Sequence, residues 1–97
     1  MVCLNPVIGR VAYSKAGRDK GRLLIVIEIL DEDFVLVADG DLRPLEKPKK
    51  KRIKHLQYTN FVAEAIAVKI ESGVKVLNSD LRDAIKDIEE MLKTRKE

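Results

Sequence analysis

The stretch Ile8–Gly40, which reads IGRVAYSKAGRDKGRLLIVIEILDEDFVLVADG, decides the fold of this chain. Its apolar residues fall into short runs, rich in β-branched side chains and separated by glycines and polar turns, a pattern typical of strands. The predicted strands are Ile8–Ser14, Leu23–Leu30 and Phe34–Ala38. Because only the acidic turn Asp31–Asp33 separates the second strand from the third, we expect these two to form an antiparallel hairpin.

Two weaker strand candidates, Leu42–Leu45 and Ile53–Gln57, lie on either side of the charged run Lys47–Arg52. Four or five short strands within about fifty residues are typical of a small barrel of the SH3-like type, which protects its edges by closing on itself. We therefore predict an SH3-like β-barrel over residues 1–57, with Tyr13 and Phe34 in its core.

The strand Leu23–Leu30 is apolar on both of its alternating faces, so another element must cover the outer face. The C-terminal segment 58–97 suits this role because it predicts two short amphipathic helices, Asn60–Ser72 and a second one capped by Asn78 or Ser79. Their apolar stripes are Val62, Ile66 and Ile70, and then Leu81, Ile85, Ile88 and Leu92, with Arg82, Lys86 and other charged residues opposite. The predicted class is mainly β with an α extension, residues 58–97, packed on the barrel. Homodimerisation through the C-terminal helices is the alternative use of the stripes.

Composition excludes several classes of protein. The chain has 97 residues, 45% hydrophobic and 36% charged, as in one small globular domain. Its longest apolar run, Leu23–Ile27, is far shorter than the ~20 residues that cross a bilayer, so no membrane partner is expected. The single cysteine, Cys3, forms no internal disulfide, which fits a reducing cytoplasm. One His and one Cys offer little for a metal site, a cofactor site or a catalytic dyad, and we predict that the protein is not an enzyme.

Positive charge is concentrated in the predicted barrel. Residues 1–57 carry twelve Lys and Arg against eight Asp and Glu, whereas residues 58–97 carry seven against eight. Two clusters account for the excess: Lys15, Arg18, Lys20 and Arg22, and then Lys47, Lys49, Lys50, Lys51, Arg52 and Lys54. Clustered cations predict binding to a polyanion, against the alternative of an ordinary solvated surface. The run Pro48–Arg52 also looks like a nuclear import signal, but its place between predicted strands disfavours that role.

Several spaced motifs resemble a known family. Lys20-Gly21 lies in a loop before an alternating strand, as in the KOW motif of ribosomal proteins and transcription factors. The segments Gly9–Tyr13, Gly21–Leu23, Leu36–Gly40 and His55–Thr59 are similar to the archaeal and eukaryotic large-subunit ribosomal protein of the L-fourteen-e type and to short bacterial KOW-domain RNA-binding proteins. The resemblance covers about residues 8–60 and not the helical tail. The chain departs from many KOW loops at Leu23 and Leu24, where they carry a second glycine.

The resemblance implies a non-catalytic protein that binds structured RNA, with ribosomal RNA of the large subunit as the expected ligand and ribosomal proteins as neighbours. Gly17 and Gly21 would let the first loop approach RNA closely, with its cations on phosphates. His55 is a candidate for RNA contact or for a structural role, and Tyr58 is a candidate for base stacking. The alternative function is a KOW-type protein-interaction module of the transcription or translation machinery, whose apolar helical surface meets a partner.

Overall fold

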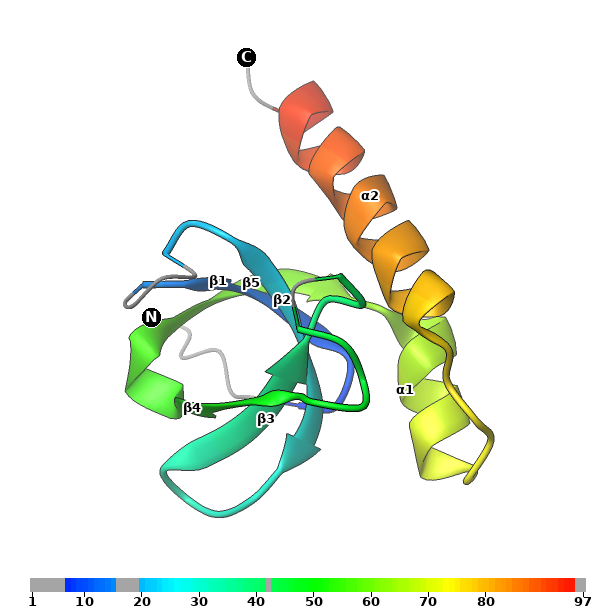
Figure 1. Cartoon of the computed structure of the whole chain (residues 1–97). Helices are drawn as coiled ribbons and strands as arrows, with labels where there is room; N and C mark the ends of the chain where they lie inside the picture. The colour runs from blue at the N-terminus through cyan, green and yellow to red at the C-terminus, as the bar shows by residue number, and fades with distance from the viewer. Residues whose placement is uncertain (1–6, 16–19, 42, 96–97) are drawn as a thin grey trace.

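The computed structural model describes residues 7–15, 20–41 and 43–95. One antiparallel sheet, with strand order β4-β3-β2-β1-β5, curls into a small barrel that carries two helices on one side (Figure 1). The strands are β1 Arg10–Ser14, β2 Leu23–Ile29, β3 Phe34–Ala38, β4 Lys49–Arg52 and β5 Leu56–Val62, and the helices are α1 Glu64–Glu71 and α2 Asn78–Arg95. This architecture confirms the predicted SH3-like barrel with a two-helix extension.

Strand β2 contributes to two separate cores, because its alternating side chains point to opposite faces of the sheet. Leu24 and Val26 lie in the barrel core with residues of the other strands: Ala12, Val35, Val37 and Leu56. Leu23 and Ile25 lie in a second core, between the sheet and the helices, with Val11, Ala38, Ile66, Leu81 and Ile88. The helices therefore cover the outer face of β2, as its two-sided apolar pattern predicts.

The end of the sheet differs from the predicted strands. Residues 43–45 are not a strand, and position 42 lies outside the described residues. The basic run itself forms β4, which pairs antiparallel with β3. A 3-10 turn, η1 (Ile53–His55), replaces the start of the predicted strand 53–57, and β5 continues to Val62. Lysine has a low β propensity, and pairing with the apolar strand β3 overrides it.

The antiparallel pairing of β1 with β5 contains a bulge next to Arg10, and side chains hold the two strands together there. Arg10 donates from Nη1 to the carbonyl of Thr59 at 2.8 Å. The Thr59 hydroxyl donates to the carbonyl of Val11 at 2.7 Å. Both side chains belong to the segments that resemble the ribosomal family, and both have a structural role in this barrel.

Helix α1 begins at Glu64 rather than at residue 60, because residues 60–62 belong to β5. It ends before Gly73, whose positive φ of 76° stops the helix as the sequence predicts. Helix α2 begins at Asn78. The Asn78 side chain ties this helix to the barrel, because its Oδ1 accepts a hydrogen bond from the Leu45 N–H at 2.7 Å and its Nδ2 donates to Glu46 at 2.9 Å.

Two glycines let the helices approach the barrel. Gly9, with φ of 89°, lies against α1, where an added Cβ would come within 2.9 Å of the Ala67 Cβ. Gly40, with φ of 79°, lies under the start of α2, where an added Cβ would collide with the Asn78 carbonyl. The Gly40 carbonyl also accepts a hydrogen bond from Arg82 at 2.8 Å. A side chain at either glycine would push a helix away from the sheet.

Candidate nucleic-acid interface

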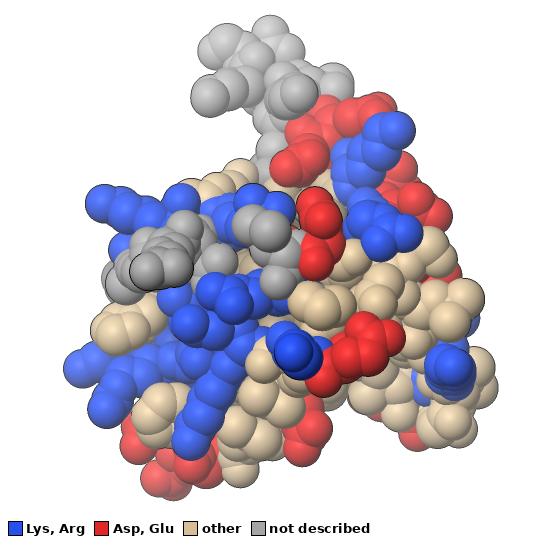
Figure 2. All heavy atoms as spheres, viewed as in Figure 1, with Lys and Arg blue, Asp and Glu red and all other residues tan. Residues whose placement is uncertain are grey.

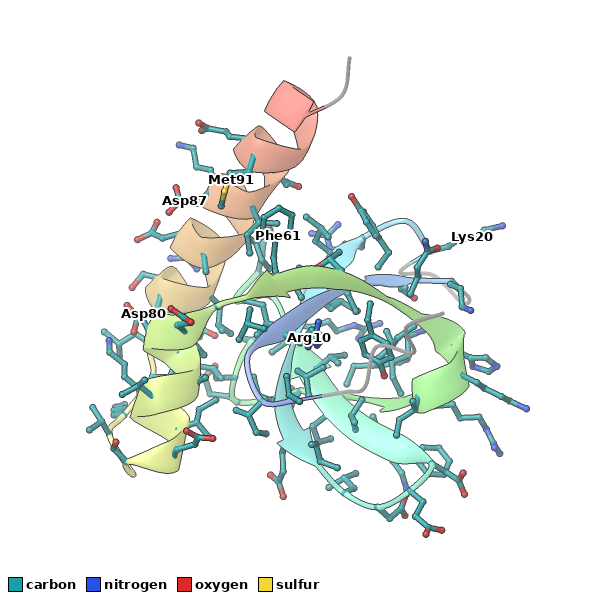
Figure 3. The ribbon with its side chains drawn as sticks, turned by 180° about the vertical axis from the view of Figure 1, so that it is seen from behind. Arg10, Lys20, Phe61, Asp80, Asp87 and Met91 are labelled. Atoms are coloured by element: carbon teal, nitrogen blue, oxygen red, sulfur yellow. The ribbon has the colours of Figure 1, made fainter. Side chains whose placement is uncertain are left out.

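The β1–β2 hairpin presents the first predicted cluster at one end of the barrel. Two backbone hydrogen bonds close its base, from Ser14 to the Arg22 carbonyl at 3.0 Å and from Gly21 to the Ser14 carbonyl at 2.8 Å. Gly21 has a φ of 85°, and nothing lies within 4 Å of the position where a Cβ would stand. Gly21 thus supplies the positive φ that the turn needs, and the surface around it is open to solvent. Lys15 and Lys20 are exposed beside it, and Figure 3 shows Lys20 at the tip of the described part of the hairpin.

Arg22 of this cluster forms ion pairs within the protein. Its Nε donates to the Asp39 carboxylate at 2.8 Å, and its second guanidinium nitrogen lies 3.7 Å from Asp41. Burial alone would raise the pKa of Asp39, but the hydrogen bonds from Arg22 and from two backbone N–H groups outweigh it and hold that pKa below its ordinary value. A phosphate at Arg22 would therefore compete with this ion pair. Arg18 and Gly17 lie outside the described residues, and their roles stay predictions.

The lysine run is divided between two faces because it forms a strand. Lys50 and Arg52 point outward and are exposed. Lys51 lies opposite the core residue Val35 and is only 7% exposed, and Lys49, two residues earlier on the same face, is half-buried. The predicted RNA contacts of Lys49 and Lys51 are not tested by this geometry, but the outer pair is the more accessible to a ligand.

Phe34, which the sequence predicts in the core, is half-buried and lies against the outward cations of β4. The Nζ of Lys50 lies 4.5 Å from the centre of its ring, and the guanidinium carbon of Arg52 lies 5.0 Å from it. The prediction is wrong because Phe34 is on the outer face at the beginning of β3. These cation–π contacts hold the two cations beside a flat aromatic ring.

The turn η1 connects the lysine run to the hairpin. At one end, the Ile53 N–H donates to the Asp33 carbonyl at 2.8 Å, and at the other, the His55 carbonyl accepts a hydrogen bond from the Lys15 N–H at 2.8 Å. Lys54 is exposed on this turn, and His55 is half-buried. The two basic clusters of the sequence are thereby joined at Lys15 and His55.

Tyr58 and Lys47 complete the set of predicted contacts. Tyr58 is half-buried, packs against the barrel core and donates from its hydroxyl to the Ile53 carbonyl at 3.4 Å. Burial raises the pKa of the Tyr58 hydroxyl. Lys47 is exposed just before β4. Part of the Tyr58 ring is covered by packing against the barrel core. Its stacking on a base remains a prediction.

The exposed cations of the hairpin, of β4 and of η1 form one surface, which we name the basic face: Lys15, Lys20, Lys50, Arg52 and Lys54. In Figure 2 the Lys and Arg atoms gather over these elements, whereas Asp and Glu atoms lie mainly on the helices and on the β2–β3 turn, which borders η1. None of these five cations forms an ion pair with an acidic side chain that the structure describes. A cationic surface of this kind attracts polyanions.

An open groove of about 690 Å³ between α2 and the hairpin adds two cations that are not among the contacts predicted from the sequence. Arg82 and Lys86 of α2 line it together with Lys20 and Arg22. Its carboxylates are Asp39, Asp41 and Glu89. From sequence, Arg82 and Lys86 belong to the solvated face of a helix. No local sequence pattern shows that Arg82 and Lys86 lie beside the hairpin, because their position depends on how α2 crosses the barrel.

Within the part of the chain that the structure describes, no helix combines the length and the apolar character needed to cross a membrane. In the same residues, His, Cys, Asp and Glu side chains form no group of three that could hold a metal ion.

No family model matches the sequence, but it is similar to several curated proteins. The large ribosomal subunit protein eL14 of Desulfurococcus amylolyticus is 42% identical over 53 residues, which cover 55% of this chain and 55% of that protein. The putative ribosome-binding protein YbzG of Bacillus subtilis is 36% identical over 72 residues, which cover 74% of this chain and 97% of YbzG. The eL14 protein of Staphylothermus marinus is 28% identical over 83 residues, which cover 84% of this chain and 86% of that protein. The match thus spans about half the length of the first relative and nearly all of the second.

Proposed function

Since the chain belongs to the eL14-like family that also contains the short bacterial protein YbzG, we propose that it binds ribosomal RNA of the large subunit. Its relatives are named as large-subunit ribosomal proteins and as a putative ribosome-binding protein, which supports a ribosome-associated role in the cytoplasm. In this role the chain is non-catalytic. It contributes a shaped, charged surface and no reacting group.

The observation that carries the proposal is the basic face. Its five cations are exposed and come from three elements that are separate in the sequence. The hydrogen bond between Lys15 and the His55 carbonyl holds the hairpin against η1, so the surface stands on a packed barrel and not on a free tail. A rigid arrangement of cations loses less conformational entropy when it binds a phosphate backbone.

Binding through the basic face depends on contacts with RNA phosphates and on how well the shape of the RNA fits this face. Each Lys or Arg that neutralises a phosphate releases counterions, which supplies affinity without reading the base sequence. Phe34, beside Lys50 and Arg52, offers part of an aromatic ring on which an unpaired base can stack. The groove lined by Lys20, Arg82 and Lys86 continues the cationic surface towards α2. Lys47 and His55 remain candidates at its margin.

Salt dependence distinguishes this function from the alternative of a protein-interaction module that uses an apolar surface. Affinity that depends on phosphate contacts falls steeply as salt increases, whereas apolar contacts are weakened little by salt. The full chain and fluorescently labelled large-subunit rRNA fragments can be compared by anisotropy over a range of salt concentrations. We expect a linear decrease of log affinity with log salt.

The double variant K15A/K54A tests the face itself. Both side chains are exposed, so we expect little change in thermal stability. If each lysine contacts one phosphate, affinity for the rRNA decreases and the slope of the salt dependence decreases by about one per lysine.

The control K69A/K75A removes the same charge from the helical side, where Lys69 pairs with Asp80 at 3.1 Å. We expect this control to keep the affinity and the salt slope of the wild type. Equal losses in the two variants would show that net charge alone, and not the basic face, governs binding. An unchanged slope in K15A/K54A would contradict the proposed phosphate contacts.

A further inference from the structure

A second groove lies on the helical side of the molecule, between α1, α2 and the end of β5. It has a volume of about 370 Å³, and its floor is apolar, with Ile66 from α1 and Ala84 and Ile88 from α2. Met91 lines its far end and is 45% exposed. Figure 3 shows Asp80, Asp87 and Met91 along α2. The groove that Lys20 lines is bounded by other α2 residues, Arg82, Ile85, Lys86 and Glu89, and it shares no residue with this one. The groove is therefore separate from the proposed RNA surface.

The rim of this groove is acidic. Asp80, Asp83 and Asp87 follow one another at helical spacing on α2, and Glu64 faces them from the start of α1. Lys69 is the one cation among the groove-lining residues that the structure describes, and it is engaged by Asp80 at 3.1 Å. Asp80 also accepts a hydrogen bond from the Leu77 N–H at 3.0 Å, and together these bonds lower its pKa. Asp80 and Lys69 thus largely neutralise each other.

The remaining carboxylates of the rim form no ion pair with a described side chain: Glu64, Asp83 and Asp87, all exposed. Asp83 and Asp87 are four residues apart on α2, and like charges at this spacing repel each other and destabilise a helix. A bound cation relieves this repulsion. The groove therefore combines an apolar floor, in which Met91 is 45% exposed while Ile66 and Ile88 are buried, with charges that repel nucleic acid and attract cations.

We propose that this groove binds a Lys/Arg-rich amphipathic helix of a partner protein. A helix laid between α1 and α2 would place its apolar side chains over Ile88 and Met91 and its cations beside Asp83, Asp87 and Glu64. The groove and the basic face share no residue, so the chain can hold RNA and a basic protein segment at the same time. The proposal does not depend on RNA binding, because no residue of the groove belongs to the basic face.

The test uses the full chain and a fluorescein-labelled synthetic peptide about 18 residues long, or five helical turns, with leucines on one face and lysines on the other. A peptide of the same composition, scrambled so that no apolar face forms, has the same charge. We expect the amphipathic peptide to bind more tightly by anisotropy. In NMR spectra, we expect the amide shifts that it causes to be concentrated in α1 and α2.

The variant D83N/D87N keeps the shape of the rim and removes two charges, and we expect about five- to tenfold weaker peptide binding. The control E28Q/E32Q removes two exposed carboxylates from the β2–β3 hairpin and should bind the peptide like the wild type. Equal weakening in both variants, or equal affinity for the scrambled peptide, would overturn the proposal. So would a dimer of the chain that D83N/D87N abolishes, because the occupant would then be a second copy.

Discussion

At the scale of single residues, cations that look alike in the sequence have different roles. Arg22 is hydrogen-bonded to Asp39, and Lys51 is nearly buried in β4. Lys15 and Lys54 are exposed. The charge clusters could be predicted from the sequence, but this division could not. It depends on strand alternation along β4 and on a carboxylate from a distant turn.

Asp39 is a nearly buried carboxylate that accepts three hydrogen bonds. Its Oδ2 accepts from Arg22 at 2.8 Å, and its Oδ1 accepts from the N–H groups of Asp41 and Arg43 at 2.8 and 2.9 Å. The variant D39N would put an amide donor against the Arg22 guanidinium. We expect a loss of about 1–3 kcal/mol in the free energy of unfolding by urea at neutral pH.

This loss should depend on pH. The pKa of Asp39 is lowered from 3.8 in the folded chain, so its carboxylate contributes stability that is present above that value and is lost as the pH falls through the folded pKa. The difference between wild type and D39N should therefore shrink in acid. Asp41 is 70% exposed, and D41N should change stability by less than about 0.5 kcal/mol. A D39N effect that is the same at neutral and acid pH would contradict the role of the Asp39 charge.

At the scale of elements, the apolar pattern of residues 23–30 predicts both the strand β2 and its covering by helices. This part of the fold follows from period-2 and period-3.6 patterns, which are local. Strand β4 and the length of β5 do not follow from such patterns. The lysines of β4 become a strand only because β3 offers them a partner, and residues 60–62 look helical until their pairing with β1 is known.

Docking of α2 on the sheet is tested by two leucines near its start. Leu81 is completely buried between α2 and the barrel, whereas Leu77 is 51% exposed. We expect L81A to lower the free energy of unfolding by about 2–5 kcal/mol, because it removes buried apolar atoms and leaves a cavity. We expect L77A to change it by less than about 0.5 kcal/mol. Equal effects in urea unfolding would contradict the packing of α2 on β2.

At the scale of the whole molecule, the chain has two sides of opposite character. The barrel carries the basic face (Figure 2), and the helices carry the acidic groove, of which Asp80, Asp87 and Met91 are labelled in Figure 3. The sequence shows this asymmetry as an excess of cations before residue 58 and of carboxylates after it. It does not show that hairpin, β4 and η1 meet in one surface, because that requires the contact of Lys15 with His55.

Co-sedimentation tests the central claim, that the basic face binds the large ribosomal subunit. Native extract containing the full chain is separated on a density gradient at low and at high salt, and the fractions are probed for the chain. The account predicts that the chain migrates with large subunits at low salt and leaves them at high salt, and that K15A/K54A migrates at the top while K69A/K75A behaves like the wild type. Migration of the wild type at the top even at low salt would contradict the account, as would association that high salt does not weaken.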